Sequence, residues 1–351
     1  MKRNLYIFYN SILKRKDNTI LYERVIDEEE TIPCTEEYFP SGVEAIPTGD
    51  KKYIPVKTIE SVLAFGEVRF NSRFLYFLSQ NSIPLHIYNQ YGNYQGSYIP
   101  PYSSPAGTIL LAEAVHYQDK IKKLFIAKQF VTGAVLNTLS NLNYYNNRSA
   151  ELCEEINLIK DLKERINYAE NIDELRGIEG SIKRIYYSAW LKILHQKTAF
   201  RRRIKNPPSD MINSLISYGN MIVYALCLNE IYFCGLYPEV GYLHEAGAGK
   251  MSLSYDIAEI FKPLLTDKII FKVINKYMIT SNDFIIKNNT CIIKPNAKKI
   301  FVKEFNDKLY TITHDKARKK KFSYKSLIKE ECIKLKKHFL GIEEYKPYHY
   351  Q

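Results

Sequence analysis

Hydrophobic and polar positions follow two different patterns along the chain, and the change between them divides it into two parts. Up to about residue 98, apolar residues gather in short runs rich in β-branched and aromatic side chains, at residues 5–9, 61–65 and 83–88. Turn-forming residues separate these runs, as is typical of β-strands. We therefore predict a small N-terminal β domain over residues 1–98.

Two segments in and after this part have the composition of loops. Residues 28–52 are acidic at first and then rich in Pro and Gly, which predicts a long loop or an insertion between strands. Residues 99–107 contain three prolines and two serines and are the best candidate for a linker between domains.

From residue 108 onward, apolar positions recur at the spacing of α-helices, first at Leu110, Leu111, Ala114 and Val115. Further helices are predicted over residues 152–169, 172–195, 210–233 and 252–261. This pattern indicates a larger, mainly α-helical C-terminal domain over residues 108–351.

Local signals refine this second part. Asp210 follows a Pro-Pro pair and is a good N-cap, and Gly235 stands where a C-cap glycine is expected. At residues 283–294, two short apolar runs flank Asn288-Asn289, which predicts a β-hairpin. The predicted class is α+β, with a small β domain followed by a helical domain that contains this hairpin.

Composition sets limits on the partners and the compartment. Lys plus Arg outnumber Asp plus Glu by 50 to 38, and the formal net charge of +12 favours a polyanionic partner or an anionic membrane surface. An ordinary basic surface is the plain alternative. We find no secretory signal and no uncharged apolar run of about 18 residues, so we expect a cytoplasmic protein without membrane contact. Six cysteines without a CxxC pair argue against a zinc site and a disulfide framework.

The stretch from residue 241 to residue 259 is the most informative for chemistry. His244 precedes a glycine-containing loop, and Ser252 or Ser254 can cap a helix that carries Asp256 and Glu259. Side chains three positions apart lie on one helix face, so both carboxylates can point to the same place. Carboxylates and an imidazole without a thiolate suit Mg²⁺ or Mn²⁺. A favourable match to the helix dipole and a packed histidine are the plain alternatives.

A second stretch places Glu179 between Ile178 and Gly180 on a predicted helix. Glycine costs a helix about 1 kcal/mol relative to alanine, so we expect another element to approach closely there. The alternative is a surface glutamate beside an unimportant glycine.

A third stretch groups cations directly before Pro207-Pro208 and the helix that Asp210 caps. Such a group could bind phosphates beside a metal site, or could be a charged loop between helices. Its members are Arg201, Arg202, Arg203 and Lys205.

Taken together, these stretches resemble a known family, the CRISPR-associated endonuclease/integrase of spacer acquisition, which is the first-numbered Cas protein family. The order and spacing of four motifs carry the resemblance. They are Gly-Ile-Glu179-Gly with Tyr186-Tyr187, Pro207-Pro208-x-Asp210-x-x-Asn213 with Tyr218-Gly219, Gly-Tyr-Leu-His244, and Ser252-Leu-x-x-Asp256-x-x-Glu259-x-x-x-Pro263. Residues 38–52 look like an insertion relative to the family.

The resemblance implies an enzyme of antiviral defence that inserts short foreign DNA fragments, called spacers, into a CRISPR array. A 3′-hydroxyl of the fragment would attack a phosphodiester of the repeat array. The family further implies a homodimer formed through the β domains, double-stranded DNA as substrate and assembly with the second-numbered Cas protein. A stand-alone, structure-selective nuclease and a non-catalytic nucleic-acid-binding scaffold are the alternatives.

By motif match, Glu179, His244 and Glu259 would be the ligands of Mg²⁺ or Mn²⁺, with Asp256 as a further catalytic acidic residue. DNA contacts are expected from the basic stretch and from two more residues. The expected contacts are Arg184, Arg201, Arg202, Arg203, Lys205 and Tyr255. A basic tail at residues 316–321 could extend this surface or be a solvated terminus.

Overall fold

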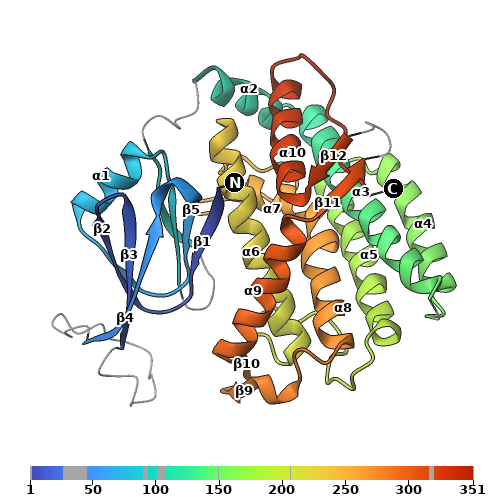
Figure 1. The fold of residues 1–351 in the computed structure, drawn as a ribbon. Coiled ribbons are helices and arrows are strands. Elements are labelled where there is room, and N and C mark those ends of the chain that lie inside the picture. The colour runs from blue at the N-terminus through green and yellow to red at the C-terminus, as the bar shows by residue number, and fades with distance from the viewer. Residues whose placement is uncertain are drawn as a thin grey trace. The chain divides into compact units, whose positions relative to one another are not determined.

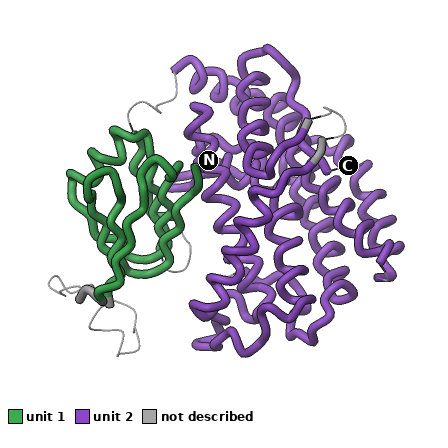
Figure 2. The backbone as a smooth tube through the Cα atoms, viewed as in Figure 1, with its two compact units in different colours: residues 1–104 green, residues 105–351 purple. Residues whose placement is uncertain are grey.

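The computed structural model describes residues 2–26, 46–89, 94–100, 107–148, 150–205, 207–315 and 320–350, without the side chains of residues 26, 46–48, 314, 315 and 320. The chain forms two compact units, residues 1–104 and residues 105–351 (Figure 2). The division falls inside the stretch predicted as a linker, of which residues 101–106 lie outside the described part.

The described part of unit 1 contains two four-stranded sheets and one helix, α1 (Ser72–Gln80) (Figure 1). The first sheet has the order β1 (Arg3–Ile7), β5 (Ile59–Ala64), β7 (Leu85–Tyr88) and β8 (Tyr94–Tyr98). The second has the order β4 (Ile46–Pro55), β3 (Thr19–Ile26), β2 (Ser11–Lys16) and β6 (Val68–Arg69). Buried side chains of both sheets and of α1 form one core, among them Ile7, Leu13, Ile20, Val62 and Phe74. The predicted β domain is therefore confirmed.

The predicted loop at residues 28–52 is wrong in its last part. Residues 46–52 belong to β4, which pairs antiparallel with β3 in the register Glu23↔Lys51. Nζ of Lys51 lies 3.3 Å from Oε1 of Glu23, and cross-strand pairs of opposite charge favour such pairing. Pro47 and Gly49, which suggested a loop, thus belong to a strand, and the acidic first part of the prediction lies in residues 27–45, outside the described part.

Unit 2 is mainly helical, as predicted (Figure 1). Its helices are α2 (Gly107–Gln118), α3 (Lys120–Asn146), α4 (Cys153–Tyr168), α5 (Ile172–Ile193), α6 (Met211–Cys234), α7 (Ser252–Phe261), α8 (Lys268–Asn275), α9 (Pro295–Leu309) and α10 (Tyr324–Phe339). Helix α7 packs against both α3 and α6 and is almost fully buried. A π-helical turn, η4 (Pro263–Asp267), joins α7 to α8, and the proline at its start, which lacks an N–H, interrupts the regular α-helical bonding.

Several local predictions for unit 2 are confirmed. The side chain of Asp210 accepts a hydrogen bond from Asn213 N at 2.9 Å and caps α6. Gly235 ends the same helix in the left-handed conformation, with φ of 71°. The hairpin forms from β9 (Phe284–Lys287) and β10 (Thr290–Ile293), with Asn288 and Asn289 at positive φ in its turn.

Helix α6 corrects the expectation that no segment is long and apolar enough to span a membrane. By length and composition this helix passes that test, which is weak evidence because core helices also pass it. Of its most apolar window, 83% is buried inside the protein. Its apolar character therefore fits a central core helix.

The prediction of a basic terminal tail at residues 316–321 is wrong, because the chain continues into further elements after these residues. Residues 316–319 lie outside the described part, but the chain continues through β12 (Lys320–Ser323), which pairs with β11 (Ile312–Asp315), into α10. Ser323 caps α10 by accepting a hydrogen bond from Ser326 N. This second hairpin was not predicted.

Candidate active site

Helix α5 carries Glu179 and, one turn later, Lys183. Their side chains form an ion pair. The ammonium of Lys183 also lies 3.0 Å from Oε2 of Glu259, which belongs to α7. One lysine thus lies between two carboxylates that come from different helices.

Glu259 is nearly buried, with 4% of its surface exposed, and has a second cationic neighbour. Nζ of Lys262 lies 2.6 Å from its Oε1. Burial alone would raise the pKa of Glu259, but the charges of Lys183 and Lys262 hold it well below the usual range. The carboxylate is therefore ionised, and each of its oxygens is paired with an ammonium group.

Asp256 lies one turn before Glu259 on α7 but makes different contacts. Its carboxylate, which is fully buried, accepts backbone N–H groups of Tyr242 at 2.6 Å, Leu243 at 3.1 Å and His244 at 2.9 Å. Its Oδ1 also lies 2.8 Å from Nδ1 of the His244 ring. Asp256 therefore fixes the backbone of residues 242–244 and the orientation of the imidazole, and Nε2 is the nitrogen left for a ligand.

The loop that carries His244 is tightly folded. A Cβ at Gly241 would lie 2.5 Å from Cβ of Ser252 and would also collide with the carbonyl oxygen of His244. Arg176 of α5 donates hydrogen bonds to the carbonyl of Leu243 from Nε at 3.0 Å and from Nη2 at 2.7 Å. The loop is thereby attached to the helix turn that precedes Glu179.

Glu179 and His244 line the same pocket, which has a volume of about 510 Å³. Tyr255 and Arg176 also line it, and the ring of Tyr255 lies 6.0 Å from that of His244 between centroids. Glu179 on α5, Tyr255 on α7 and His244 in the loop between α6 and α7 therefore line one pocket, whereas Glu259 is not among its lining residues.

The donor set fits a divalent cation in charge and chemistry. Among the described residues, no three His, Cys, Asp or Glu side chains form a ready metal cluster. However, Glu179 and Glu259 share one cation, the ammonium of Lys183, which shows that both carboxylates reach a common cationic position. A metal bound by both would have to replace this ammonium.

Two local interpretations of the site are wrong. Among described atoms, a Cβ at Gly180 would meet nothing within 4 Å, so no close approach explains this glycine. The N-cap of α7 is Met251, which makes no side-chain cap hydrogen bond. The hydroxyl of Ser252 instead donates to the carbonyl of Glu245 at 2.8 Å and thereby closes the loop that carries His244.

The cations of the basic stretch before α6 differ in whether they face solvent or bond to α6. Arg201, Arg202 and Lys205 are exposed. Partial burial of its ammonium group, and then the charges of Lys183 and Lys262, lowers the pKa of Lys205. Arg203 differs, because its guanidinium bonds Asn213 Oδ1 at 3.0 Å and Ser217 Oγ at 2.8 Å and so ties the stretch to α6.

The sequence interpretation missed Lys183, Lys262 and Arg176. Lys183 follows Glu179 by four positions and Lys262 follows Glu259 by three, which are the spacings at which side chains meet on a helix. That signal was present in the sequence. Arg184, by contrast, is exposed on α5, one position beyond Lys183.

Comparisons with known proteins give the family of this chain. The family model described as CRISPR associated protein Cas1 matches residues 5–307. A relative from Clostridium perfringens, named CRISPR-associated endonuclease Cas1, is 40% identical over 351 residues, which cover 99% of this chain and 98% of the relative. The solved structure of a Cas1 protein from Thermotoga maritima has a TM-score of 0.80 and 31% identity, and the match covers 99% of this chain and 100% of that one.

A more distant likeness shows the fold alone. A casposase solved with its integration product has a TM-score of 0.83 at 21% identity, and the match covers 100% of this chain and 95% of that one. The family model matches residues 5–307, and the relative from Clostridium perfringens aligns with 99% of this chain. This chain therefore belongs to the Cas1 family of CRISPR-associated proteins.

Proposed function

We propose that this chain is a metal-dependent DNA endonuclease and integrase that inserts spacer fragments into a CRISPR array. The observation that carries the proposal is the shared position of Glu179 and Glu259 around Lys183, with His244 in the same pocket as Glu179. The names of the relatives and the integration product held by the casposase support a role in cutting and joining DNA.

In this proposal, Glu179, Glu259 and Nε2 of His244 hold Mg²⁺ or Mn²⁺. When bound there, the ion would supply Lewis-acid stabilisation of charge on the phosphate oxygens. Asp256 keeps the imidazole oriented by the hydrogen bond at 2.8 Å. Lys262, whose pKa is raised by Glu259 against the effect of burial, stays protonated beside the site and can neutralise phosphate charge.

The attacking group would be the 3′-hydroxyl of a short DNA fragment, and the bond that breaks is a phosphodiester of the target strand. The 3′-oxygen of the target strand leaves as a new 3′-hydroxyl while the phosphate becomes joined to the fragment, so the number of phosphodiester bonds is unchanged. With water as the attacking group, the same site would cleave DNA without joining it.

The experiment that tests this is a strand-transfer assay with labelled fragment and target DNA, with and without Mn²⁺. We expect Glu179→Ala, His244→Ala and Glu259→Ala each to lose joined product, while Glu239→Ala, which changes an exposed residue, stays active. Thermal unfolding of each variant checks the fold. Joined product at the wild-type rate in the triple variant would refute the assignment.

The same assay separates the alternatives. A structure-selective nuclease would give cleaved strands without joined product. A scaffold without catalysis would bind DNA equally with and without metal and would leave all strands intact.

The resemblance also leads us to propose a homodimer formed through unit 1, a cytoplasmic location and assembly with the second-numbered Cas protein on DNA. Light scattering of the purified chain, alone and mixed with that partner, would measure both stoichiometries. A monomer at micromolar concentration would count against the dimer.

A further inference from the structure

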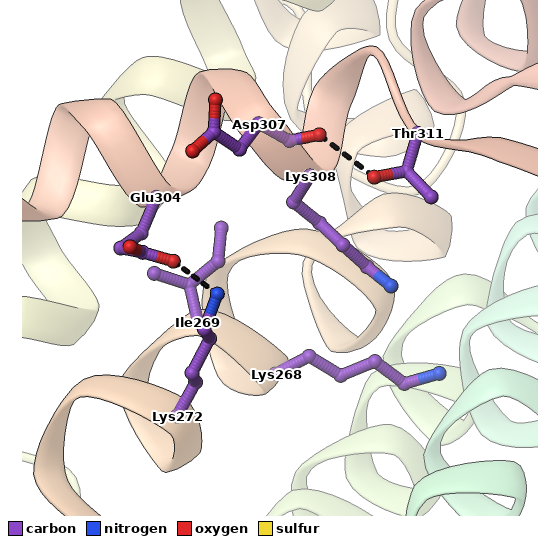
Figure 3. A pocket seen from close by; sticks show the side chains of 7 residues that line it. All are labelled: Lys268, Ile269, Lys272, Glu304, Asp307, Lys308 and Thr311. Atoms are coloured by element: carbon purple, nitrogen blue, oxygen red, sulfur yellow. Dashed lines mark hydrogen bonds and ion pairs between the residues drawn. The ribbon is translucent and has the colours of Figure 1, made fainter. Parts of the chain in front are cut away.

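A second pocket of unit 2 lies between α8 and α9, away from the residues described above. It has a volume of about 240 Å³, and three of its lining residues are lysines, Lys268, Lys272 and Lys308 (Figure 3). Two acidic residues, Glu304 and Asp307, also line it, so the charge around the pocket is mixed. What the pocket can bind therefore depends on which of the lysines lack an acidic partner.

The three lysines differ in their partners. Lys272 forms an ion pair with Glu304, which neutralises it. Among the described side chains, no carboxylate lies within ion-pair distance of Lys268 or Lys308. Figure 3 shows both ammonium groups pointing the same way, away from the Lys272 and Glu304 pair, with the carboxylate of Asp307 turned away from them.

Aromatic rings flank both of these ammonium groups. Nζ of Lys268 lies 4.4 Å from the ring centre of Tyr350, and Nζ of Lys308 lies 4.7 Å from that of Tyr324. The backbone N–H of Tyr350 donates to Oδ1 of Asn137 at 2.7 Å, which fixes the main chain that carries this ring. Cation–π contacts place the two lysines without neutralising them.

The charged forms of both lysines are disfavoured in this pocket. Burial, and then the charge of Lys308, lowers the pKa of Lys268 to about 8. Burial, and then the charge of Lys272, lowers the pKa of Lys308. An anion bound between the two ammonium groups would reverse this cost, because opposite charge favours the protonated form.

We propose that Lys268 and Lys308 form a binding site for a phosphate group of the DNA backbone. A phosphodiester carries one negative charge shared over two non-bridging oxygens, and each of these oxygens can accept from one ammonium donor. Lys268 follows Glu259 by nine residues through α7, η4 and α8, and both sites belong to unit 2.

The inference rests on the proposed function in that the chain must bind DNA. A first test is protection from acetylation. The whole chain is treated with an amine-reactive acetylating reagent, alone, with duplex DNA and with inorganic phosphate, and each lysine is quantified by mass spectrometry. We expect DNA to protect Lys268 and Lys308 at least severalfold, whereas exposed Lys160 and Lys303 react as before.

A second test is DNA affinity measured against salt. A protein that neutralises one phosphate fewer has a salt slope smaller by about 0.9, which at about 0.1 M salt corresponds to an affinity about eightfold weaker. We expect this change in Lys268→Gln/Lys308→Gln, whereas Lys160→Gln/Lys303→Gln, with the same change in charge, stays within about twofold of wild type. Lys268→Arg/Lys308→Arg keeps both charges and should keep most of the affinity.

Each outcome decides the proposal. Equal affinity of the pocket variant and its charge-matched control would overturn it, and so would unprotected lysines in saturating DNA. Equal protection by inorganic phosphate alone would identify a site for free phosphate and overturn the assignment to DNA. A chain that binds no DNA at all would refute the proposed function itself, which distinguishes that failure from failure of this site.

Discussion

Nδ1 of His244 and Oδ1 of Asp256 lie 2.8 Å apart, and the same carboxylate accepts the backbone N–H of His244 at 2.9 Å. One buried side chain therefore holds both the ring and the main chain of the residue that we propose as a metal ligand. The ring cannot reorient without breaking a hydrogen bond to a carboxylate that is fully buried.

Asp256→Asn should weaken metal binding without removing a ligand. The amide nitrogen cannot accept the N–H groups that the carboxylate now accepts, so the His244 ring should lose its fixed orientation. Loss of such an orienting partner typically lowers metal affinity by about 10–100-fold. Calorimetric titration with Mn²⁺ measures this, with Asp161→Asn on the exposed face of α4 as the control. An unchanged affinity for Mn²⁺ would show that Asp256 has only a structural role.

Lys183→Met should make the protein depend on metal for stability. Without the ammonium, the carboxylates of Glu179 and Glu259 are left close to each other, and in the absence of metal the unfolding temperature should fall. Added Mn²⁺ should then raise it more than in wild type, because no ammonium has to be displaced. Lys192 lies on α5, like Lys183, and pairs with Glu155 of α4, so Lys192→Met is the matched control. The idea fails if Mn²⁺ stabilises both variants equally.

The cations before α6 should separate into two kinds. Arg201→Gln/Arg202→Gln should lower the salt slope of DNA binding by about 0.9 for each phosphate that is no longer neutralised, and should leave stability unchanged. Arg203→Gln should instead lower the unfolding temperature, because it removes the bonds to Asn213 and Ser217. Fluorescence anisotropy and thermal unfolding measure the two effects. A reversed pattern would mean that Arg203 is the residue that contacts DNA.

Glu113→Gln should stabilise the protein above neutral pH. Burial raises the pKa of Glu113 to about 8, against the opposing hydrogen bond from Tyr237 N. Because the folded pKa lies above the unfolded value, the wild type loses stability as pH rises from about 4.5 to about 8, while the neutral amide does not. We expect similar unfolding temperatures at pH 5 and a gain of at least several degrees for the variant at pH 8. Exposed Glu170→Gln should show no such trend, and an equal trend in both would refute the role of burial.

Part of the fold followed from local sequence signals. Asp210 caps α6, Gly235 ends it, and Asn288-Asn289 turns the β9–β10 hairpin, because each depends only on residues a few positions away. The β4 strand and the second hairpin could not be read in this way. Each of these strands is held by backbone hydrogen bonds to a partner strand, and β4 also by the ion pair of Lys51 with Glu23 of β3.

The candidate site, too, was predictable from the sequence only in part. The motifs singled out Glu179, His244, Asp256 and Glu259, and helical spacing alone placed Asp256 and Glu259 on one face of α7.

Only the tertiary structure decided what each residue does. It bound Asp256 to the His244 loop, set Lys183 between carboxylates of two helices and turned Arg203 inward. The physical reason is range: caps, turns and helix faces are fixed by neighbours within one or two turns of chain. Ion pairs and buried hydrogen bonds between elements depend on how those elements pack.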